Sequence, residues 1–112
     1  MTLSNKSDFI YTIHQLQSFI KKEWNLTWTD FTILSILDQL QNDEFLVYSS
    51  MIVSKMNLDT RYCYRRINKL KQLELIGSQS AVKPFCSDLL SLAPRGYLLI
   101  KTVKRKFKTL NT

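Results

Sequence analysis

Glycine and proline are scarce in this sequence, with two residues of each among 112. Turn-rich β-sandwiches and disordered chains use many more of both, so the composition argues against these classes. Long apolar runs are also missing, since none approaches the roughly 18 residues that a membrane-spanning helix needs. The first residues lack the apolar stretch and small-residue cleavage site of a secretory signal. We therefore expect a folded cytoplasmic protein.

Cysteine and histidine are equally rare. Cys63 and Cys86 are the two cysteines, and His14 is the one histidine. A cytoplasmic chain keeps two such thiols reduced, and they do not make a disulfide framework. One histidine far from both thiols gives no metal-ligand spacing. We interpret the cysteines as ordinary buried or half-buried thiols, with a redox switch as the alternative, and we predict no metal site and no cofactor.

Motifs of catalysis are absent from the sequence as well. It contains no glycine-rich phosphate loop and no Ser or Cys paired with His at a useful spacing. Asp43 and Glu44 are adjacent carboxylates, but they fall where a loop is expected and a solvated loop explains them. The sequence therefore predicts a protein that is not an enzyme.

The chain does have a net positive charge, and the excess of Lys and Arg is confined to its second half. The net charge is +7, yet residues 1–54 carry three lysines against six carboxylates, whereas residues 55–112 carry thirteen Lys and Arg against three carboxylates. Such an asymmetry within one domain predicts a face that binds a polyanion. A nucleic acid and a membrane surface both fit, and charge alone does not choose between them.

Hydrophobic spacing predicts two helices in the first part of the chain. Apolar residues recur every three or four positions over 9–24 and again over 31–40. Thr27 and Asp30 have the spacing of a capping box at the start of the second helix. Because this helix is apolar over more than half of its circumference, we expect it to be the central helix of the core.

The later elements follow in a recognisable order. The pattern predicts a strand, a short helix, a longer helix, a β-hairpin and a last helix, over residues 45–48, 51–56, 59–73, 75–92 and 94–110. Asp59 is a suitable N-cap for the longer helix, and Pro94 suits the first position of the last one. Two short helices joined by three or four residues and followed by a β-hairpin indicate a winged helix-turn-helix. The predicted fold is mainly α with a small β-hairpin, in the order α-α-β-α-α-β-β-α.

We expect all 112 residues to form one domain with three functional parts. These are the dimerisation helices at 8–24 and 94–110, the helix-turn-helix at 48–73 and the wing at 75–92. The apolar stripe of the last helix is predicted to consist of Tyr97, Ile100, Val103, Phe107 and Leu110.

The helix predicted over 59–73 has two different faces. On a wheel of 3.6 residues per turn, Cys63, Ile67 and Leu70 fall together and are expected to face the core. The opposite side carries Arg61, Arg65, Asn68, Lys69 and Gln72, with Tyr62, Tyr64 and Arg66 on the flanks. Side chains of these types pair with phosphates and with base edges in the major groove. This face predicts double-stranded DNA as the partner, and an ordinary solvated face is the alternative.

The N-terminal half of such a helix goes deepest into the groove. We therefore expect bases to be read by Thr60, Arg61, Tyr62, Tyr64 and Arg65, with Lys69 and Gln72 meeting the DNA backbone or solvent. The full set of predicted DNA contacts is Ser49, Lys55, Thr60, Arg61, Tyr62, Tyr64, Arg65, Arg66, Asn68, Lys69 and Lys83.

Three segments add a family resemblance. They are Ile20-Lys21-Lys22-Glu23-Trp24 with Leu26-Thr27-Trp28-Thr29-Asp30-Phe31, the stretch over 67–76, and Leu92-Ala93-Pro94-Arg95-Gly96-Tyr97-Leu98. Together they resemble the SarA branch of the MarR-like transcriptional regulators: the entry to the second helix, the passage from recognition helix to wing, and the Leu-Thr-x-x-Gly-x-x-Leu that opens the last helix. Their order and spacing carry the resemblance more than any single segment.

The resemblance implies a homodimer in which the first and last helices of two chains pack together and two wings flank two recognition helices. It assigns base reading to the same five positions as the wheel. The family's wing usually ends in Asp-x-Arg, whose Arg enters the minor groove, whereas residues 83–88 contain no Arg and Lys83 is their only cation. Cys63 and Cys86 lie away from the position of the family's oxidant-sensing cysteine, so that role does not carry over.

The sequence thus predicts a dimeric, sequence-specific regulator of bacterial transcription that reads the major groove with residues 59–73, with no membrane partner and no small-molecule ligand indicated. The alternative is a winged-helix interaction or accessory module of a plasmid or phage replication or transfer system, with Tyr62, Tyr64 and Phe85 as an exposed apolar patch. A membrane-surface role for the last helix would rest on its five cations beside an apolar stripe, but a dimer core explains that stripe more simply.

Overall fold

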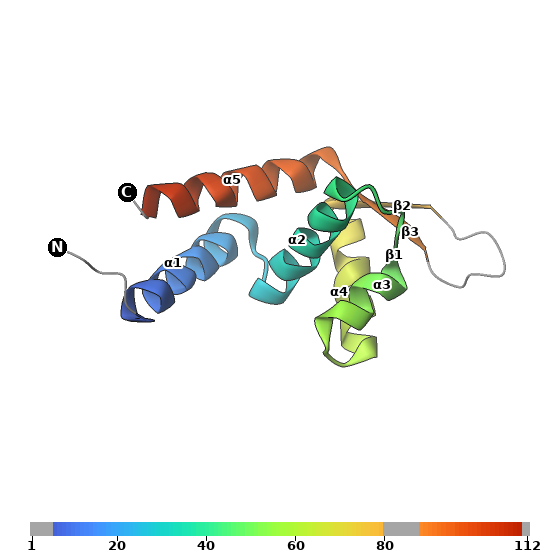
Figure 1. The fold of residues 1–112 in the computed structure, drawn as a ribbon, viewed down its shortest axis with the longest axis horizontal. Coiled ribbons are helices and arrows are strands. Elements are labelled where there is room, and N and C mark those ends of the chain that lie inside the picture. Colours follow the sequence, from blue (N-terminus) through green and yellow to red (C-terminus); the bar gives the residue numbers. More distant parts are fainter. Residues whose placement is uncertain (1–5, 80–87, 111–112) are drawn as a thin grey trace.

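The computed structural model describes residues 6–79 and 88–110, with the side chains from residue 9 onward. Its helices are α1 (Lys6–Trp24), α2 (Trp28–Asn42), α3 (Ser49–Met56), α4 (Thr60–Gln72) and α5 (Pro94–Leu110), and its strands are β1 (Val47–Tyr48), β2 (Ile76–Gln79) and β3 (Leu89–Leu92). The elements follow one another in the predicted order, which confirms the fold class (Figure 1). Within the described ranges, no helix has both the length and the apolarity to cross a membrane.

α2 is the central helix of the core. It contacts α1, α3, α4, α5, β1 and β3. Ile33, Leu34 and Leu37 are completely buried along its inward side. Full burial of an aliphatic side chain contributes roughly 1.5–3 kcal/mol, so this one helix supplies a large share of the hydrophobic stabilisation. The predicted role of the second helix is therefore confirmed.

The predicted caps are present at two helix starts. The Thr27 hydroxyl accepts a hydrogen bond from the Asp30 backbone N–H (3.1 Å), and the Asp30 carboxylate accepts one from the Thr27 N–H (2.9 Å). The carboxylate of Asp59 accepts a hydrogen bond from the Tyr62 N–H (3.0 Å) at the start of α4. α1 begins at Lys6, two residues before the predicted start of the first helix.

Four helices end without glycine. The residues that leave α1, α2, α3 and α4 in the left-handed conformation, with φ between 54° and 66°, are Asn25, Glu44, Asn57 and Glu74. Asn tolerates this conformation, whereas a residue such as Glu gives up about 1–2 kcal/mol in adopting it. Because the sequence has few glycines, residues with a side chain occupy these left-handed positions, and the two glutamates do so with backbone strain.

The small sheet has the strand order β1-β3-β2, and both pairs are antiparallel. The strand predicted over 45–48 is shorter than expected. Within 45–48, β3 pairs with Val47 and Tyr48 alone, so Phe45 and Leu46 lie in the preceding loop with exposed side chains.

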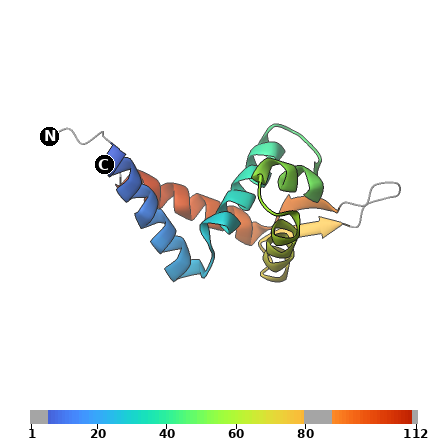
Figure 2. The same cartoon turned by 90° about the horizontal axis from the view of Figure 1, so that it is seen from below.

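The molecule is elongated, with principal extents of 58 × 27 × 26 Å. α1 and α5 lie side by side and project from the remaining elements, and both chain ends lie at their free end (Figures 1 and 2). We call α1 and α5 the arm, and the other helices with the sheet the head. The Cα radius of gyration is 15.4 Å, against about 13 Å for a compact domain of this length.

The inward face of α5 differs from the predicted stripe. Ile100 and Val103 are buried as expected, but Gly96 and Leu99 are buried beside them, while Tyr97 and Phe107 are exposed. The arm consists of two helices only, so α1 and the head cover one side of α5 and leave the rest in solvent.

Gly96 provides a test of how the arm joins the head. A Cβ at this position would collide with the backbone carbonyl oxygen of Leu75, which cannot rotate away. We expect Gly96→Ala to lower the free energy of unfolding by about 2–3 kcal/mol, measured by urea denaturation. Gly77→Ala is the matched control. The nearest atom to its Cβ would be the Ser91 hydroxyl oxygen, at 3.3 Å, and the Ser91 carbonyl oxygen would be at an ordinary contact distance of 3.9 Å. Because the hydroxyl can rotate, we expect a loss below about 1 kcal/mol. Equal losses would contradict this interpretation of the junction.

Candidate nucleic-acid interface

α4 packs against the head through one narrow face. Cys63, Ile67 and Leu70 are buried there, against α2, α3 and β2, which confirms the two-faced helix. Burial, and to a lesser degree the charge of Asp59, raises the pKa of the Cys63 thiol. The thiol therefore stays protonated and unreactive, as expected for an ordinary core cysteine.

The opposite face of α4 is open to solvent. Its exposed residues are Thr60, Arg61, Arg65, Asn68, Lys69 and Gln72, while Tyr62 and Tyr64 are half-buried on the flanks. Lys55, in the last turn of α3, is exposed as well. The guanidinium carbon of Arg65 lies 5.9 Å from the centre of the Tyr62 ring, a cation–π distance that favours one position of the arginine.

Four of the five predicted base-reading residues, all except Tyr62, lie together at the N-terminal end of α4. Thr60, Arg61, Tyr64 and Arg65 line one open hollow with Asp59, with a volume of about 630 Å³. Three of these side chains carry hydrogen-bond donors on long or rigid arms. The hollow is therefore suited to contact a polar, anionic surface.

Two predicted contacts have other positions, and a third lies outside the described residues. Ser49 is buried at the start of α3, and its backbone N–H donates to the Asp88 carbonyl oxygen (2.9 Å). Arg66 turns inward to Asp30. Lys83 lies outside the described residues, as do Phe85 and Cys86.

Arg66 and Asp30 form an ion pair between the middle of α4 and the start of α2. Arg66 Nε lies 2.7 Å from Asp30 Oδ1, and Arg66 Nη2 lies 2.7 Å from Asp30 Oδ2. The Asp30 side chain is completely buried, and that of Arg66 is 26% exposed. Two parallel hydrogen bonds between charged groups fix both the distance and the angle between their helices.

The surroundings of Asp30 act on its acidity in opposite directions. Burial raises the pKa of the Asp30 carboxyl, but the hydrogen bonds from Arg66 and Thr27 and the charge of Arg66 outweigh it and hold this pKa below its usual value. The hydrogen bond to Asp30 raises the pKa of Arg66 against the opposing effect of its burial. Both groups are therefore charged at neutral pH.

A second ion pair holds the C-terminal end of α4. Lys71 Nζ lies 2.6 Å from Asp88 Oδ2, just before β3. Because the Asp88 carbonyl also accepts the Ser49 N–H, the residue before β3 is tied to both α3 and α4. The two helices and the base of the wing thus form one rigid unit.

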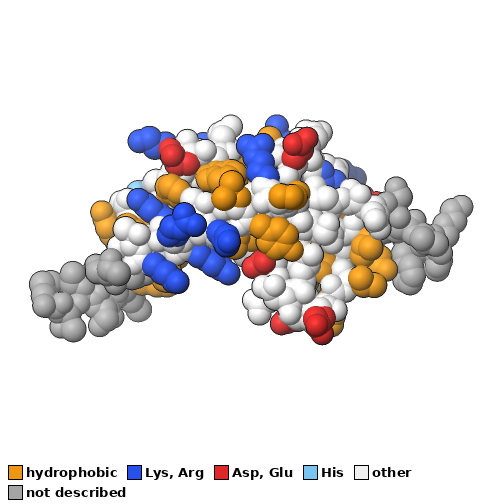
Figure 3. Space-filling view, turned by 90° about the horizontal axis from the view of Figure 1, so that it is seen from above, with side chains coloured by type: hydrophobic (Ala, Val, Ile, Leu, Met, Phe, Trp, Pro, Cys, Tyr) orange, Lys and Arg blue, Asp and Glu red, His pale blue; other side chains and the backbone are white. Residues whose placement is uncertain are grey.

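Positive charge is not confined to α4. α5 contains six Lys or Arg residues and no carboxylate. Figure 3, a view onto the long side of the molecule that α5 lines in Figure 1, shows Lys and Arg side chains gathered over the arm. The basic half of the sequence therefore divides in space into two surfaces, one on α4 and one on α5.

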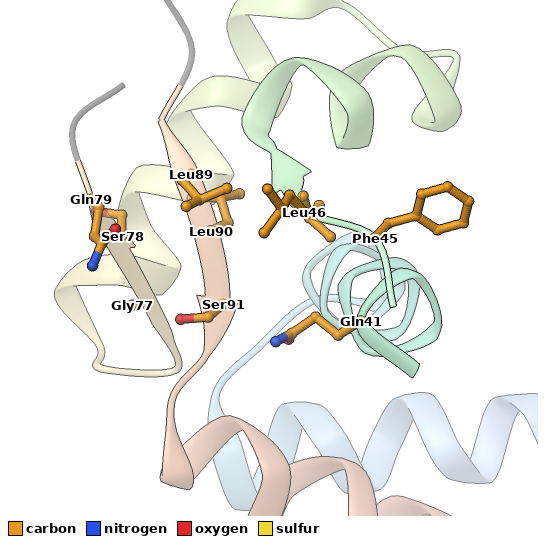
Figure 4. Close-up of a pocket in the computed structure, with 10 residues that line it drawn as sticks. Gln41, Phe45, Leu46, Gly77, Ser78, Gln79, Leu89, Leu90 and Ser91 are labelled. Atoms are coloured by element: carbon orange, nitrogen blue, oxygen red, sulfur yellow. The ribbon is translucent and has the colours of Figure 1, made fainter. Parts of the chain in front are cut away.

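An apolar hollow of about 440 Å³ lies between the end of α2 and the sheet (Figure 4). Phe45 and Leu46, which are 56% and 69% exposed, are on one side of it. The Gln41 amide oxygen accepts a hydrogen bond from the Leu92 N–H (2.9 Å) and joins α2 to β3. In the part of the chain that the structure describes, no group of three His, Cys, Asp or Glu side chains could hold a metal ion.

Asp30→Asn tests the importance of the buried pair. The substitution leaves Arg66 without a charged partner, and we expect it to lower the free energy of unfolding by about 2–4 kcal/mol near neutral pH. Because the pKa of Asp30 is lower in the folded state than in the unfolded one, this stabilisation is present above about pH 4. It should disappear as the pH falls through the lower, folded-state value. Urea denaturation of both proteins from neutral to acid pH measures the difference.

Asp38→Asn is the control for this experiment. Asp38 lies 3.8 Å from Lys104, whose side chain is 69% exposed. The Asp38 side chain is 14% exposed, but its partner is largely in solvent and the separation is long. A pair with so mobile a partner contributes at most about 1 kcal/mol, so the control should lose little. A loss in Asp30→Asn that is no larger than in the control, or that stays constant from neutral to acid pH, would contradict the role assigned to Asp30.

The sequence matches no protein-family model and no curated protein. Solved structures do match. The Staphylococcus aureus MepR–DNA complex superposes with a TM-score of 0.78 at 13% identity, covering 93% of this chain and 82% of MepR. AbsC, a MarR family transcriptional regulator from Streptomyces coelicolor, gives 0.71 at 15% identity over 93% and 68% of the two chains. MarR gives 0.69 at 18% identity over 96% and 80%. The chain therefore has the winged helix-turn-helix fold of the MarR-family regulators.

Proposed function

We propose that this protein is a dimeric regulator of transcription that binds double-stranded DNA and reads the major groove with α4. The observation that carries the proposal is the solvent-exposed basic face of α4, held in place by ion pairs at its middle and at its C-terminal end. The similarity to MepR, solved in complex with DNA, supports it.

The surface that we propose to contact DNA is narrower than the sequence suggests. It consists of Lys55, Thr60, Arg61, Tyr62, Tyr64, Arg65, Asn68 and Lys69. We leave out Ser49, which is buried, and we give Arg66 the task of positioning α4. Arg61 and Arg65 lie one helical turn apart, so both can reach the edges of neighbouring bases, where Arg pairs with guanine.

The proposed dimer rests on the free end of the arm. Phe9 continues the stripe that includes the buried Leu16 and Ile20, yet it is 67% exposed, since none of the residues that the structure describes covers it. Ile10, Tyr11 and Phe107 are exposed on the same two helices. Adjacent large apolar side chains of this kind mark an association surface. Two α4 helices related by a two-fold axis would need DNA half-sites about one helical turn apart, roughly 10 base pairs.

A second candidate is a winged-helix module that binds another protein. The observation that favours it is the apolar hollow of the head with the exposed Phe45 and Leu46 beside it. In that case DNA binding would be weak and indifferent to sequence. Selection of bound duplexes from a random pool at physiological salt separates the candidates, because only the regulator enriches a palindromic site.

Arg65→Ala tests the reading helix. We expect at least a tenfold loss of affinity for the selected duplex, since Arg65 is exposed in the hollow at the N-terminal end of α4. A bidentate contact to a base is worth about 1–3 kcal/mol, and a phosphate contact gives a similar loss at moderate salt. Fluorescence anisotropy measures the dissociation constant. Lys21→Ala, which removes one exposed charge from the arm, should bind within about twofold of the wild type. Wild-type affinity in Arg65→Ala would exclude this docking.

Phe9→Glu tests the dimer. A carboxylate at the end of the apolar stripe should convert a dimer to a monomer, because burying an unpaired charge costs several kcal/mol. Size-exclusion chromatography with light scattering reports the mass. Phe45→Glu introduces the same charge at a similarly exposed phenylalanine of the head and should leave the mass unchanged. If Phe9→Glu remains a dimer, the interface lies elsewhere.

A further inference from the structure

α5 carries a row of cations that the proposed contact with DNA does not use. Of its six basic residues, two are accounted for by packing within the arm. Arg95 lies 5.8 Å from the Trp24 ring and donates to the Leu73 carbonyl, and Lys106 lies 5.5 Å from the Phe19 ring. The remaining four are Lys101, Lys104, Arg105 and Lys108, all exposed, which we call the α5 stripe.

The spacing of the α5 stripe places its members on one side of the helix. Each is three or four positions from two of the others, so their side chains are neighbours along the outer surface of α5. Lys104 has the single carboxylate nearby, Asp38 at 3.8 Å, and no ion pair among the described residues includes Lys101, Arg105 or Lys108. Like charges at this spacing destabilise a helix. A bound polyanion would relieve that repulsion.

The stripe is distant from the surface proposed to read DNA. α5 runs along one long side of the molecule, and α3 and α4 lie on the opposite side, with α2 between them (Figure 1). A straight duplex held by α4 therefore does not reach the stripe. Any polyanion on the stripe is a second one.

Two other occupants fit the stripe poorly. A membrane surface would need an apolar face on α5 free to insert, but Leu99, Ile100 and Val103 are buried in the core. A second copy of the chain would bring the stripe against its own image across a two-fold axis, where like charges repel. The stripe from Lys101 to Lys108 is about 10 Å long, which matches roughly three phosphates of one DNA strand at about 3.4 Å each along the axis.

We infer that the α5 stripe is a second site for double-stranded DNA, which contacts phosphates without reading bases, so that one dimer holds two duplex segments. This inference rests on the proposed function of α4. Because the contact is electrostatic, it is indifferent to sequence, and its affinity falls steeply with salt.

The test is a bridging assay with the full-length protein. The selected duplex is fixed to beads, and the protein must capture a second, fluorescent duplex of unrelated sequence from solution. In Lys101→Gln/Arg105→Gln we expect capture of the second duplex to fall at least tenfold, while affinity for the fixed duplex stays within twofold. The slope of log affinity against log salt for the second duplex should become smaller by about 1.8, because each of the two neutralised phosphates accounts for about 0.9.

Lys21→Gln/Lys22→Gln is the matched control, since it also removes two exposed positive charges, but from α1. Capture by this control should remain at the wild-type level. The inference is overturned if the wild type binds the fixed duplex but captures no second one, if both double variants reduce capture equally, or if the stripe variant changes the mass of the dimer. It is also overturned if polyglutamate or anionic vesicles compete for the stripe better than duplex DNA. Failure of the proposed function is distinguishable, because the wild type would then not bind the fixed duplex selectively and Arg65→Ala would make no difference.

Discussion

Asp30 is a buried carboxylate that joins two helices at once. It closes the capping box of α2 through Thr27 and holds the guanidinium of Arg66 from α4. A carboxylate with no exposed surface is stable only while all of these partners stay in place. Since α2 contacts nearly every other element, this pair and the buried face of α4 together fix the orientation of α4 relative to the rest of the molecule. Arg66 thus determines how the other arginines of α4 are presented.

The path of the chain explains why charge has one distribution in sequence and another in space. Residues 55–112 carry thirteen Lys and Arg against three carboxylates, but after the wing the chain returns along α1 as α5, on the far side from α4. Only half of the basic region therefore belongs to the head. The other half of the basic residues belongs to α5 in the arm, whose end also carries exposed aromatic side chains. The arm therefore has a surface that is both basic and aromatic.

The sequence predicted what depends on local spacing. The caps at Thr27 and Asp59 and the inward face of α4 follow from contacts three or four residues apart, and they are present. It did not predict the partner of Arg66, because a residue on the flank of a helix can face solvent or the core, and Asp30 lies 36 positions away. The inward turn of Leu99 was missed for a related reason. α5 has apolar residues on more than one side, and the packing of α1 against it decides which of them are buried.

In the proposed dimer, the elongated shape links the stability of the protein to its concentration. An arm of two helices buries little surface of its own, and the apolar side chains at its end are exposed to solvent unless another molecule covers them. Association stabilises whatever it covers by mass action, so the folded state gains free energy as the protein becomes more concentrated. In the proposed dimer, the melting temperature therefore rises with protein concentration. A freshly diluted or newly synthesised chain is the one most open to proteolysis.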